Sequence, residues 1–289
     1  MSKCLIISMR PKQWIKNLFI FAALIFSQRL LELHSLFIVF LGFILFSLAS
    51  SGGYIINDII DLEKDRHHPI KSKRPIASGS LEKNFALSFA ILLIAFSLGG
   101  AFLINTNFFV SIIFYLFLSL SYSVWLKKVV IIDIIALSFG FVIRVIAGAL
   151  IIDVEMSLWL IICTVFLSLF LILAKRRHEL VLLEDDASSH REILSEYSPS
   201  FIDEMISAIT GATIIAYSLY AFSMRERYER YGDFLPITIP FVLYGIFRYL
   251  YLVHQKGRGG SPEIDITQDK PLLLNIFIWV ISVLLIIYL

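Results

Sequence analysis

Residues 57–65 read Asn57-Asp58-Ile59-Ile60-Asp61-Leu62-Glu63-Lys64-Asp65 and directly follow a long apolar segment at 35–56. Taken as a helix, they gather four metal-capable side chains on one face, at roughly 0, 40, 80 and 100°: Asn57, Asp61, Asp65 and Asp58. Three like charges this close are costly unless a positive group lies between them. Oxygen ligands at this spacing suit Mg²⁺, which is usually shared between carboxylates and the phosphates of a substrate.

The chain as a whole is apolar enough to lie in a membrane. It has 289 residues, 58% hydrophobic and 17% charged, and its mean hydropathy is +0.83. A soluble domain of this length carries more charge. Its net charge of +2 gives no sign of a nucleic-acid partner, and the isolated Cys4 and Cys163 indicate neither a disulfide nor a zinc site. We therefore predict an all-α, polytopic membrane protein in contact with membrane lipids.

Nine apolar segments have about the 20 residues that a membrane-spanning helix needs. They are residues 15–33, 35–56, 84–104, 107–125, 130–152, 157–175, 204–224, 233–253 and 271–289.

The charges between these segments predict the topology. Of the 25 Lys and Arg residues, 19 lie in the N-terminal segment and in alternate connections, which include loops 57–83 and 176–203. The positive-inside rule places this set in the cytoplasm, with the N-terminus inside and the C-terminus outside. The arginines at 225–230 fit this less well, although acidic residues lie among them.

The acidic stretch is followed by a basic loop. Pro69 and Pro75 should end the helix near His68. Lys71 and Arg74 then lie beside the acidic face, as the binding of a magnesium–phosphate complex requires. For these basic residues alone, a solvated positive-inside loop is an equally good interpretation.

The second long loop begins with a mixed-charge stripe. If the span at 157–175 continues as a helix, Lys175, Arg176, Glu179 and Asp186 come within about 100° of one another. They could supply a phosphate contact and a second metal contact, with Glu179 as a ligand. Alternatively, they are charged side chains snorkelling at a helix end.

Further candidates for substrate binding lie at span ends and within spans. Tyr122 and Lys127 end the span at 107–125, where Lys127 could reach a diphosphate. Arg144 lies in mid-span, where a charge almost always faces a partner or a polar cavity. Arg248 lies nearer the cytoplasmic end of its span.

The N-terminal segment Arg10-Pro-Lys-Gln-Trp-Ile-Lys-Asn17 predicts a helix that starts at its proline. In an α-helix, Lys12 and Lys16 form a basic stripe, and Gln13 and Asn17 form an amide stripe. We select Lys16 and Asn17 as substrate-binding candidates.

Residues 57–65 resemble the first Asp-rich motif of the UbiA superfamily of intramembrane prenyltransferases, whose nine helices surround a central cavity. The segments at 10–17, 65–79 and 175–180 are similar to the decaprenyl-phosphate phosphoribosyltransferase branch. The second motif of ordinary members is Asp-rich, whereas here the loop opens with Lys175-Arg176-Arg177. The resemblance implies a single domain over residues 1–289, in a bacterial inner membrane, with loops 57–83 and 176–203 closing the active site.

This branch transfers 5-phosphoribose from phosphoribosyl pyrophosphate (PRPP) to a polyprenyl phosphate, for the precursors of arabinofuranose-containing polysaccharides. Asn57, Asp61 and Lys127 would then be catalytic. The metal ligands would be Asn57, Asp58, Asp61, Asp65 and Glu179. The substrate-binding residues would be Lys16, Asn17, Lys71, Arg74, Tyr122, Lys127, Arg144, Lys175, Arg176 and Arg248.

Two other functions fit the same sequence. A conventional prenyltransferase would use a polyprenyl diphosphate as donor and an aromatic acceptor, and the first motif serves either reaction. A transporter or channel is disfavoured, because the carboxylates lie at the membrane edge rather than at its midplane. A homo-oligomer is compatible with the sequence.

Overall fold

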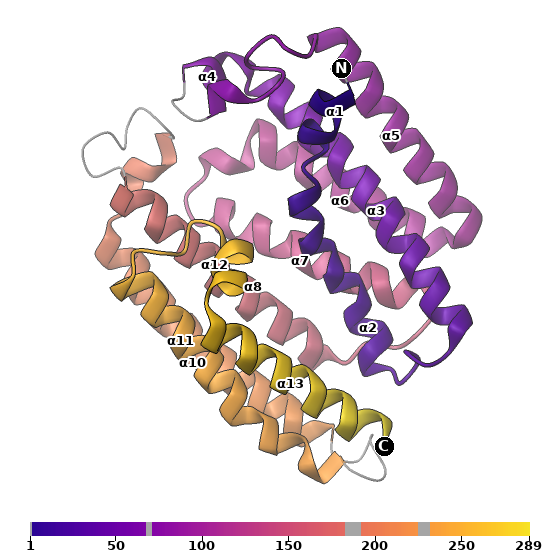
Figure 1. Ribbon diagram of the computed structural model, residues 1–289, viewed down its shortest axis with the longest axis vertical. Coiled ribbons are helices and arrows are strands. Elements are labelled where there is room, and N and C mark those ends of the chain that lie inside the picture. Colours follow the sequence, from indigo (N-terminus) through magenta and orange to yellow (C-terminus); the bar gives the residue numbers. More distant parts are fainter. Residues whose placement is uncertain (1, 68–70, 183–191, 225–231) are drawn as a thin grey trace. The chain divides into compact units, whose positions relative to one another are not determined.

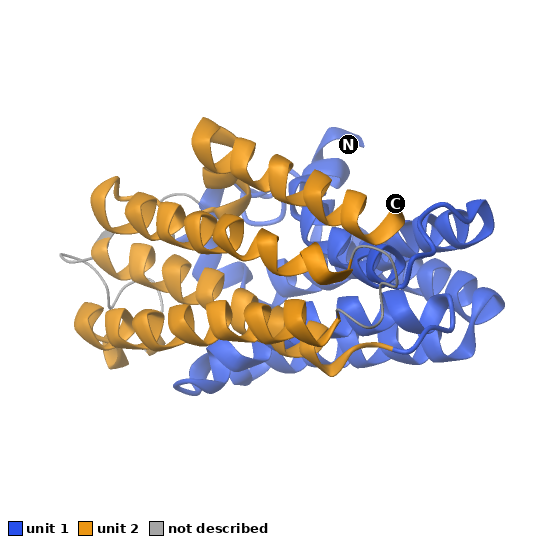
Figure 2. Ribbon diagram, turned by 90° about the horizontal axis from the view of Figure 1, so that it is seen from below, with its two compact units in different colours: residues 1–155 blue, residues 156–289 orange. Residues whose placement is uncertain are grey.

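The computed structural model describes residues 2–67, 71–182, 192–224 and 232–289, and within these ranges it contains helices and no strand (Figure 1). The described chain forms two compact units, residues 1–155 and 156–289 (Figure 2). The arginines at 225–230, His68 and the acidic cluster at 184–186 lie outside the described residues.

Unit 1 contains the N-terminal segment and four long helices. Its elements are α1 (Ser2–Met9), η1 (Pro11–Ile20), α2 (Phe21–Phe26), α3 (Leu33–Ile60), α4 (Leu62–Arg66), η2 (Lys71–Lys73), α5 (Lys83–Ile104), α6 (Thr106–Val124), η3 (Leu126–Lys128) and α7 (Ile132–Ile151). The symbol η denotes a 3₁₀ helix.

Unit 2 also contains four long apolar helical segments. Its elements are α8 (Leu158–Leu182), η4 (Glu192–Glu196), α10 (Pro199–Ser223), η5 (Gly232–Thr238), α11 (Ile239–Gln255), α12 (Pro262–Gln268) and α13 (Lys270–Tyr288).

Eight helices in the described residues are long and apolar enough to cross a membrane, four in each unit. Each overlaps one of the predicted segments, which confirms a polytopic helical membrane protein. The predicted count of nine is not confirmed, because the segment at 15–33 is not one long α-helix. It forms the last part of η1, the short helix α2 and the turn before α3.

The segment from η1 to α2 is nevertheless long. Ten residues in a 3₁₀ helix rise about 20 Å, and the six residues of α2 add about 9 Å. The sum is close to the hydrocarbon thickness of a bilayer, about 30 Å. With η1 as an α-helix, the same residues would form a shorter segment, because an α-helix rises less per residue than a 3₁₀ helix.

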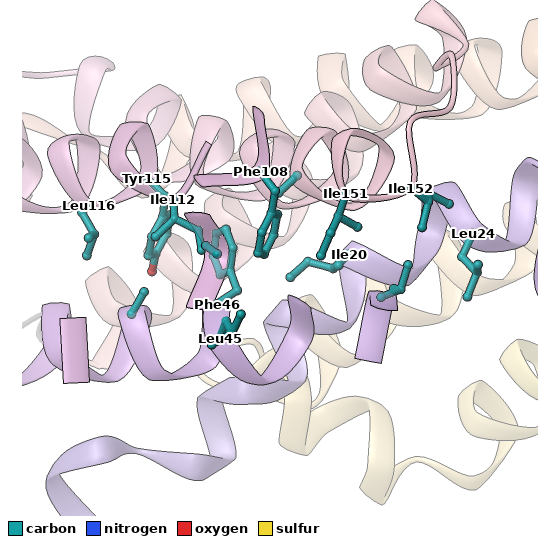
Figure 3. Close-up of a cluster of buried hydrophobic side chains, with 14 residues drawn as sticks. Ile20, Leu24, Leu45, Phe46, Phe108, Ile112, Tyr115, Leu116, Ile151 and Ile152 are labelled. Atoms are coloured by element: carbon teal, nitrogen blue, oxygen red, sulfur yellow. The ribbon is translucent and has the colours of Figure 1, made fainter. Parts of the chain in front are cut away.

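The main core of unit 1 joins this segment to α3, α6 and α7 (Figure 3). Ile20, Phe46 and Phe108 are fully buried there. Gly148 of α7 permits the closest approach, because a Cβ atom at this position would lie 1.9 Å from the carbonyl oxygen of Ile20.

A second apolar cluster fixes the loop that follows the acidic stretch. Ile76 and Leu81 are each 3% exposed and pack in one cluster with Ile55 of α3. The backbone of Arg74 is held as well, because its N–H donates to the carbonyl of Lys71 at 2.9 Å. The basic loop is thus folded onto the end of α3.

Candidate active site

The acidic stretch forms the end of α3 and the short helix α4. A bend at Asp61 separates the two helices, but helical hydrogen bonds continue through it, from Asp61 N–H to Asn57 O at 2.9 Å and from Asp65 N–H to Asp61 O at 2.8 Å. The second helix ends at Arg66, with His67 as its C-cap. The motif is helical as predicted, but as two helices interrupted at Asp61 rather than one, and the second ends two residues before His68.

Two of the three aspartates in the stretch are buried against arginine. The side chains of Asp58 and Asp65 are 3% and 5% exposed. Arg74 donates through one nitrogen to both, at 3.0 Å to Asp58 Oδ1 and 2.6 Å to Asp65 Oδ2. One cation therefore pairs with carboxylates from two successive helices, which stabilises the folded loop.

Arg10 supplies the second cation and was not among the predicted site residues. Its guanidinium also donates to Asp58 Oδ1 and lies over the ring of Tyr54, 5.3 Å from the centroid. Its backbone is left-handed, with φ of 53°. The only signal in the sequence was an arginine immediately before the proline that starts a helix.

Asp61 is the most accessible of the three aspartates in the acidic stretch. Its side chain is 23% exposed and accepts a hydrogen bond at 2.6 Å from Lys127 Nζ of η3, whose side chain is 22% exposed. Asn57, one helical turn earlier, is half-buried, as is Tyr122 of α6. The structure thus brings together two predicted catalytic residues, Asp61 and Lys127, from segments 66 positions apart.

These positions allow a test of whether Mg²⁺ fits. Among the described residues, no group of three or more His, Cys, Asp and Glu is arranged to hold a metal ion. Asp58 and Asp65 already hold arginine, which leaves Asn57 and Asp61 as accessible oxygen donors. Mg²⁺ is commonly bound by one or two side chains together with waters and substrate phosphates. The residues therefore fit a metal that arrives with a diphosphate.

The 3₁₀ geometry of η1 changes the predicted stripes. Residues three apart share a face in a 3₁₀ helix, so the predicted pairing of Gln13 with Asn17, four apart, is wrong, as is that of Lys12 with Lys16. The face of Trp14 and Asn17 turns inward. Trp14 Nε1 donates to Ser51 at 3.0 Å, while Lys16 is half-buried on another face.

Asn17 is 1% exposed, and its amide nitrogen donates to the hydroxyls of Ser47 and Ser50 of α3 at 2.9 and 3.3 Å. Its carbonyl oxygen accepts from Arg144 Nε at 2.7 Å. Asn17 thus joins η1 to both α3 and α7. This burial supports a structural contribution, whereas a contact with substrate stays a prediction.

Arg144 lies in a polar and aromatic cage. Besides Asn17, its guanidinium donates to Gly140 O at 2.6 Å and to Tyr115 OH at 3.1 Å. The rings of Tyr115, Phe46 and Phe141 lie 4.7, 5.4 and 5.6 Å from its central carbon. These contacts offset part of the cost of a buried charge. Arg144 is only 4% exposed, so its predicted substrate contact stays a prediction.

Lys71, a further predicted site residue of unit 1, is half-buried in η2, and its predicted substrate contact stays a prediction. The other predicted site residues lie in unit 2. The helix α8 continues through Lys175 to Leu182, as expected, and Arg176 donates to Glu179 at 2.8 Å. Arg248 of α11 donates to both oxygens of Asp269, at 3.1 and 2.9 Å, and this hydrogen bonding lowers the pKa of Asp269. The predicted roles of these residues in substrate and metal binding stay predictions.

Known enzymes are similar to this chain over nearly its whole length. The decaprenyl-phosphate phosphoribosyltransferase of Corynebacterium glutamicum is 32% identical over 97% of this chain and 86% of its own length. The enzyme of that name from Mycobacterium tuberculosis is 33% identical over 96% of this chain and 91% of its own length.

Solved structures share the fold. A UbiA homologue from Archaeoglobus fulgidus, bound to GPP and Mg²⁺, superposes with a TM-score of 0.73 over 99% of this chain and 100% of its own, at 18% identity. Residues 17–262 match the UbiA prenyltransferase family, and this range contains the acidic motif, Lys127 and most of each unit. The chain belongs to the UbiA prenyltransferase family.

Proposed function

We propose that this membrane enzyme transfers 5-phosphoribose from PRPP to a polyprenyl phosphate and releases diphosphate. The observation that carries the proposal is the 32–33% identity, over nearly the whole of both chains, to enzymes named for this transfer. The end of α3 supports it, because Arg10, Arg74 and Lys127 surround the acidic motif there. A diphosphate and a separate phosphate require several cations.

The reaction is a displacement at the anomeric carbon of the ribose. An oxygen of the polyprenyl phosphate forms the new bond to this carbon, and the bond to the diphosphate breaks, so that diphosphate leaves with the electron pair. The attacking oxygen is already negative, so no strong general base is needed. Direct attack inverts the carbon and gives a β-linked product from the α-linked donor, for use in arabinofuranose-containing polysaccharides.

Asn57 and Asp61 would hold Mg²⁺ on the diphosphate. The metal would supply Lewis-acid neutralisation of the negative charge that develops on the leaving group. Lys127, within 2.6 Å of Asp61, would then be released from its ion pair to contact a phosphate oxygen. The acceptor's hydrocarbon chain would lie among the apolar helices.

The direct test uses the purified full-length protein in detergent with PRPP, a polyprenyl phosphate and Mg²⁺. We expect lipid-linked phosphoribose, with loss of turnover in EDTA and recovery on addition of Mg²⁺. A control reaction without polyprenyl phosphate should give no lipid product. Absence of the lipid-linked sugar, with one of the related enzymes active in parallel, would contradict the proposal.

A prenyl transfer to an aromatic acceptor is the second candidate. It is supported by the match of residues 17–262 to a family named for prenyl transfer. The same preparation should therefore be given a polyprenyl diphosphate and an aromatic acid. A prenylated product without PRPP turnover would reverse the ranking.

We also propose that the chain crosses a bacterial inner membrane nine times, with η1 and α2 together as the additional crossing. The N-terminus would then be cytoplasmic and the C-terminus external. A reporter active only outside the cytoplasm should be active when fused after Leu289 and inactive when fused at Ser80 in the basic loop. Inactivity at Leu289, with intact expression, would argue against an odd number of crossings.

A further inference from the structure

Two guanidinium groups converge on one buried carboxylate at the end of α3. Asp58 Oδ1 accepts from both Arg10 and Arg74, and Arg74 is held by Asp65 as well. The arginine side chains remain partly exposed, 26% for Arg10 and 28% for Arg74, whereas the side chain of Asp58 is only 3% exposed. Each guanidinium has five N–H donors, so each has more donors than these contacts use.

The arginines are held in a defined orientation. Arg74 stands on a loop fixed by Ile76 and Leu81 in the apolar cluster below it. Arg10 is fixed by its stacking on Tyr54, and its backbone is left-handed, a conformation that is unfavourable for a residue other than glycine. Such strain is retained where the surrounding structure imposes it, typically at functional sites. Preorganised guanidinium groups match the oxygens of phosphate.

We propose that Arg10 and Arg74 form a subsite for a phosphate monoester that is not bridged by the metal, and that Asp58 and Asp65 are positioning residues for these arginines rather than metal ligands. This inference rests on the proposed function for its substrates. Both substrates carry a monoester, namely the 5-phosphate of PRPP and the phosphate of the polyprenyl acceptor. Asp61 follows Asp58 by three residues at the end of α3, where the helical hydrogen bonds continue, and residues with this spacing have Cβ atoms about 5–6 Å apart, so the subsite adjoins the proposed metal position.

The first test is binding, which does not depend on turnover. Thermal unfolding of the purified protein is followed in EDTA with ribose 5-phosphate or with farnesyl phosphate. At least one of them should stabilise the wild type, and Arg10→Gln and Arg74→Gln should remove that stabilisation. Stabilisation by neither compound, or equal stabilisation of the wild type and both variants, would overturn the inference.

The second test shows whether the subsite binds the phosphate of PRPP or that of the polyprenyl acceptor. It also shows whether Asp58 positions an arginine or binds the metal. In turnover assays, Arg10→Gln should raise KM about tenfold for PRPP alone if the subsite holds the 5-phosphate, and for the lipid alone if it holds the acceptor. Arg10→Lys, which keeps the charge but loses the planar fork, should recover only part of the affinity. Unchanged KM for both substrates in Arg10→Gln and Arg74→Gln would contradict the proposal.

Asp58→Asn should reproduce the KM increase of Arg10→Gln and leave the Mg²⁺ concentration for half-maximal rate unchanged. The two changes together should be less than additive, because they remove one interaction. A shifted Mg²⁺ requirement without a KM effect would instead make Asp58 a metal ligand.

Arg66→Gln is the matched control, since Arg66 is 50% exposed and pairs with the exposed Glu63. The KM of this variant should change less than twofold. An inactive wild type that still binds a monoester through Arg10 would contradict the proposed function alone.

Discussion

Replacing Asp61 with alanine should abolish turnover, lowering kcat/KM for PRPP by roughly a thousandfold, or about 4 kcal/mol of transition-state stabilisation. Among the three aspartates of the motif, Asp61 is the one that is accessible and paired with lysine rather than buried against arginine. Its loss would remove the charged oxygen donor proposed for Mg²⁺ and leave Lys127 without its partner. The measurement is initial rate at saturating Mg²⁺, with thermal unfolding to show that the variant is folded.

Two comparisons make this result specific. Asp61→Asn keeps an oxygen donor and should retain more activity than Asp61→Ala, at a higher Mg²⁺ requirement. Glu63→Ala, two positions away on α4, is the matched acidic control, because its side chain is 75% exposed; its activity should stay within about twofold of the wild type. Activity of Asp61→Ala equal to that of Glu63→Ala would remove Asp61 from the catalytic site.

Gly148→Ala should destabilise unit 1 by about 3 kcal/mol or more. The added methyl group overpacks the tight backbone contact between α7 and η1 and forces these two helices apart. The added Cβ would lie 1.9 Å from the carbonyl oxygen of Ile20, and backbone cannot rotate away as a flexible side chain can. For a protein of this size, the loss corresponds to a decrease in Tm of roughly 6–12 °C. Thermal unfolding in detergent would measure it.

Gly99→Ala provides the control for this substitution. Gly99 lies in the last part of α5, and a methyl group there meets no described atom within 4 Å. Alanine also has the better helix propensity, so Tm should stay the same or rise slightly. If Gly148→Ala unfolds at the temperature of Gly99→Ala, then η1 and α7 do not pack as closely as described.

Most of the fold could be predicted because long apolar segments in a membrane protein leave few choices of secondary structure. In lipid, the backbone must satisfy its hydrogen bonds internally, so each segment becomes a helix. The exception is η1, where length and hydropathy do not distinguish a 3₁₀ from an α-helix. The distinguishing pattern is a period of three, in which Trp14, Asn17 and Ile20 face inward while Ile15 and Leu18 are 43% and 50% exposed.

The candidate site was only partly predictable. Spacing along the helix correctly placed Asp58 and Asp65 on a shared face, since Arg74 reaches both. Spacing could not show that these two aspartates are buried while Asp61 is accessible, because their burial depends on where loop 71–81 folds. Arg10 was missed for a related reason: its contact with Asp58 spans 48 positions and depends on a left-handed backbone that local sequence does not specify.

Arg144 shows how much of a buried contact can be predicted from sequence. A mid-span arginine predicts a partner, and one exists, but it is the amide of Asn17 rather than a carboxylate. The polar residues of the N-terminal segment and the charge in α7 were each noticed, yet nothing in the sequence paired them across 127 positions. Such pairings come from packing, not from the composition of either segment.

The ten residues of η1 are fixed at both ends, by the ion pair of Arg10 with Asp58 and by the contact of Ile20 with Gly148. Adding or removing one residue between these points would rotate the helix by about 120° and shift it by about 2 Å. One of the two contacts would then be lost. Surface loops commonly tolerate insertions, whereas this N-terminal segment has no such freedom, so its length should vary as little as the acidic motif that it reaches.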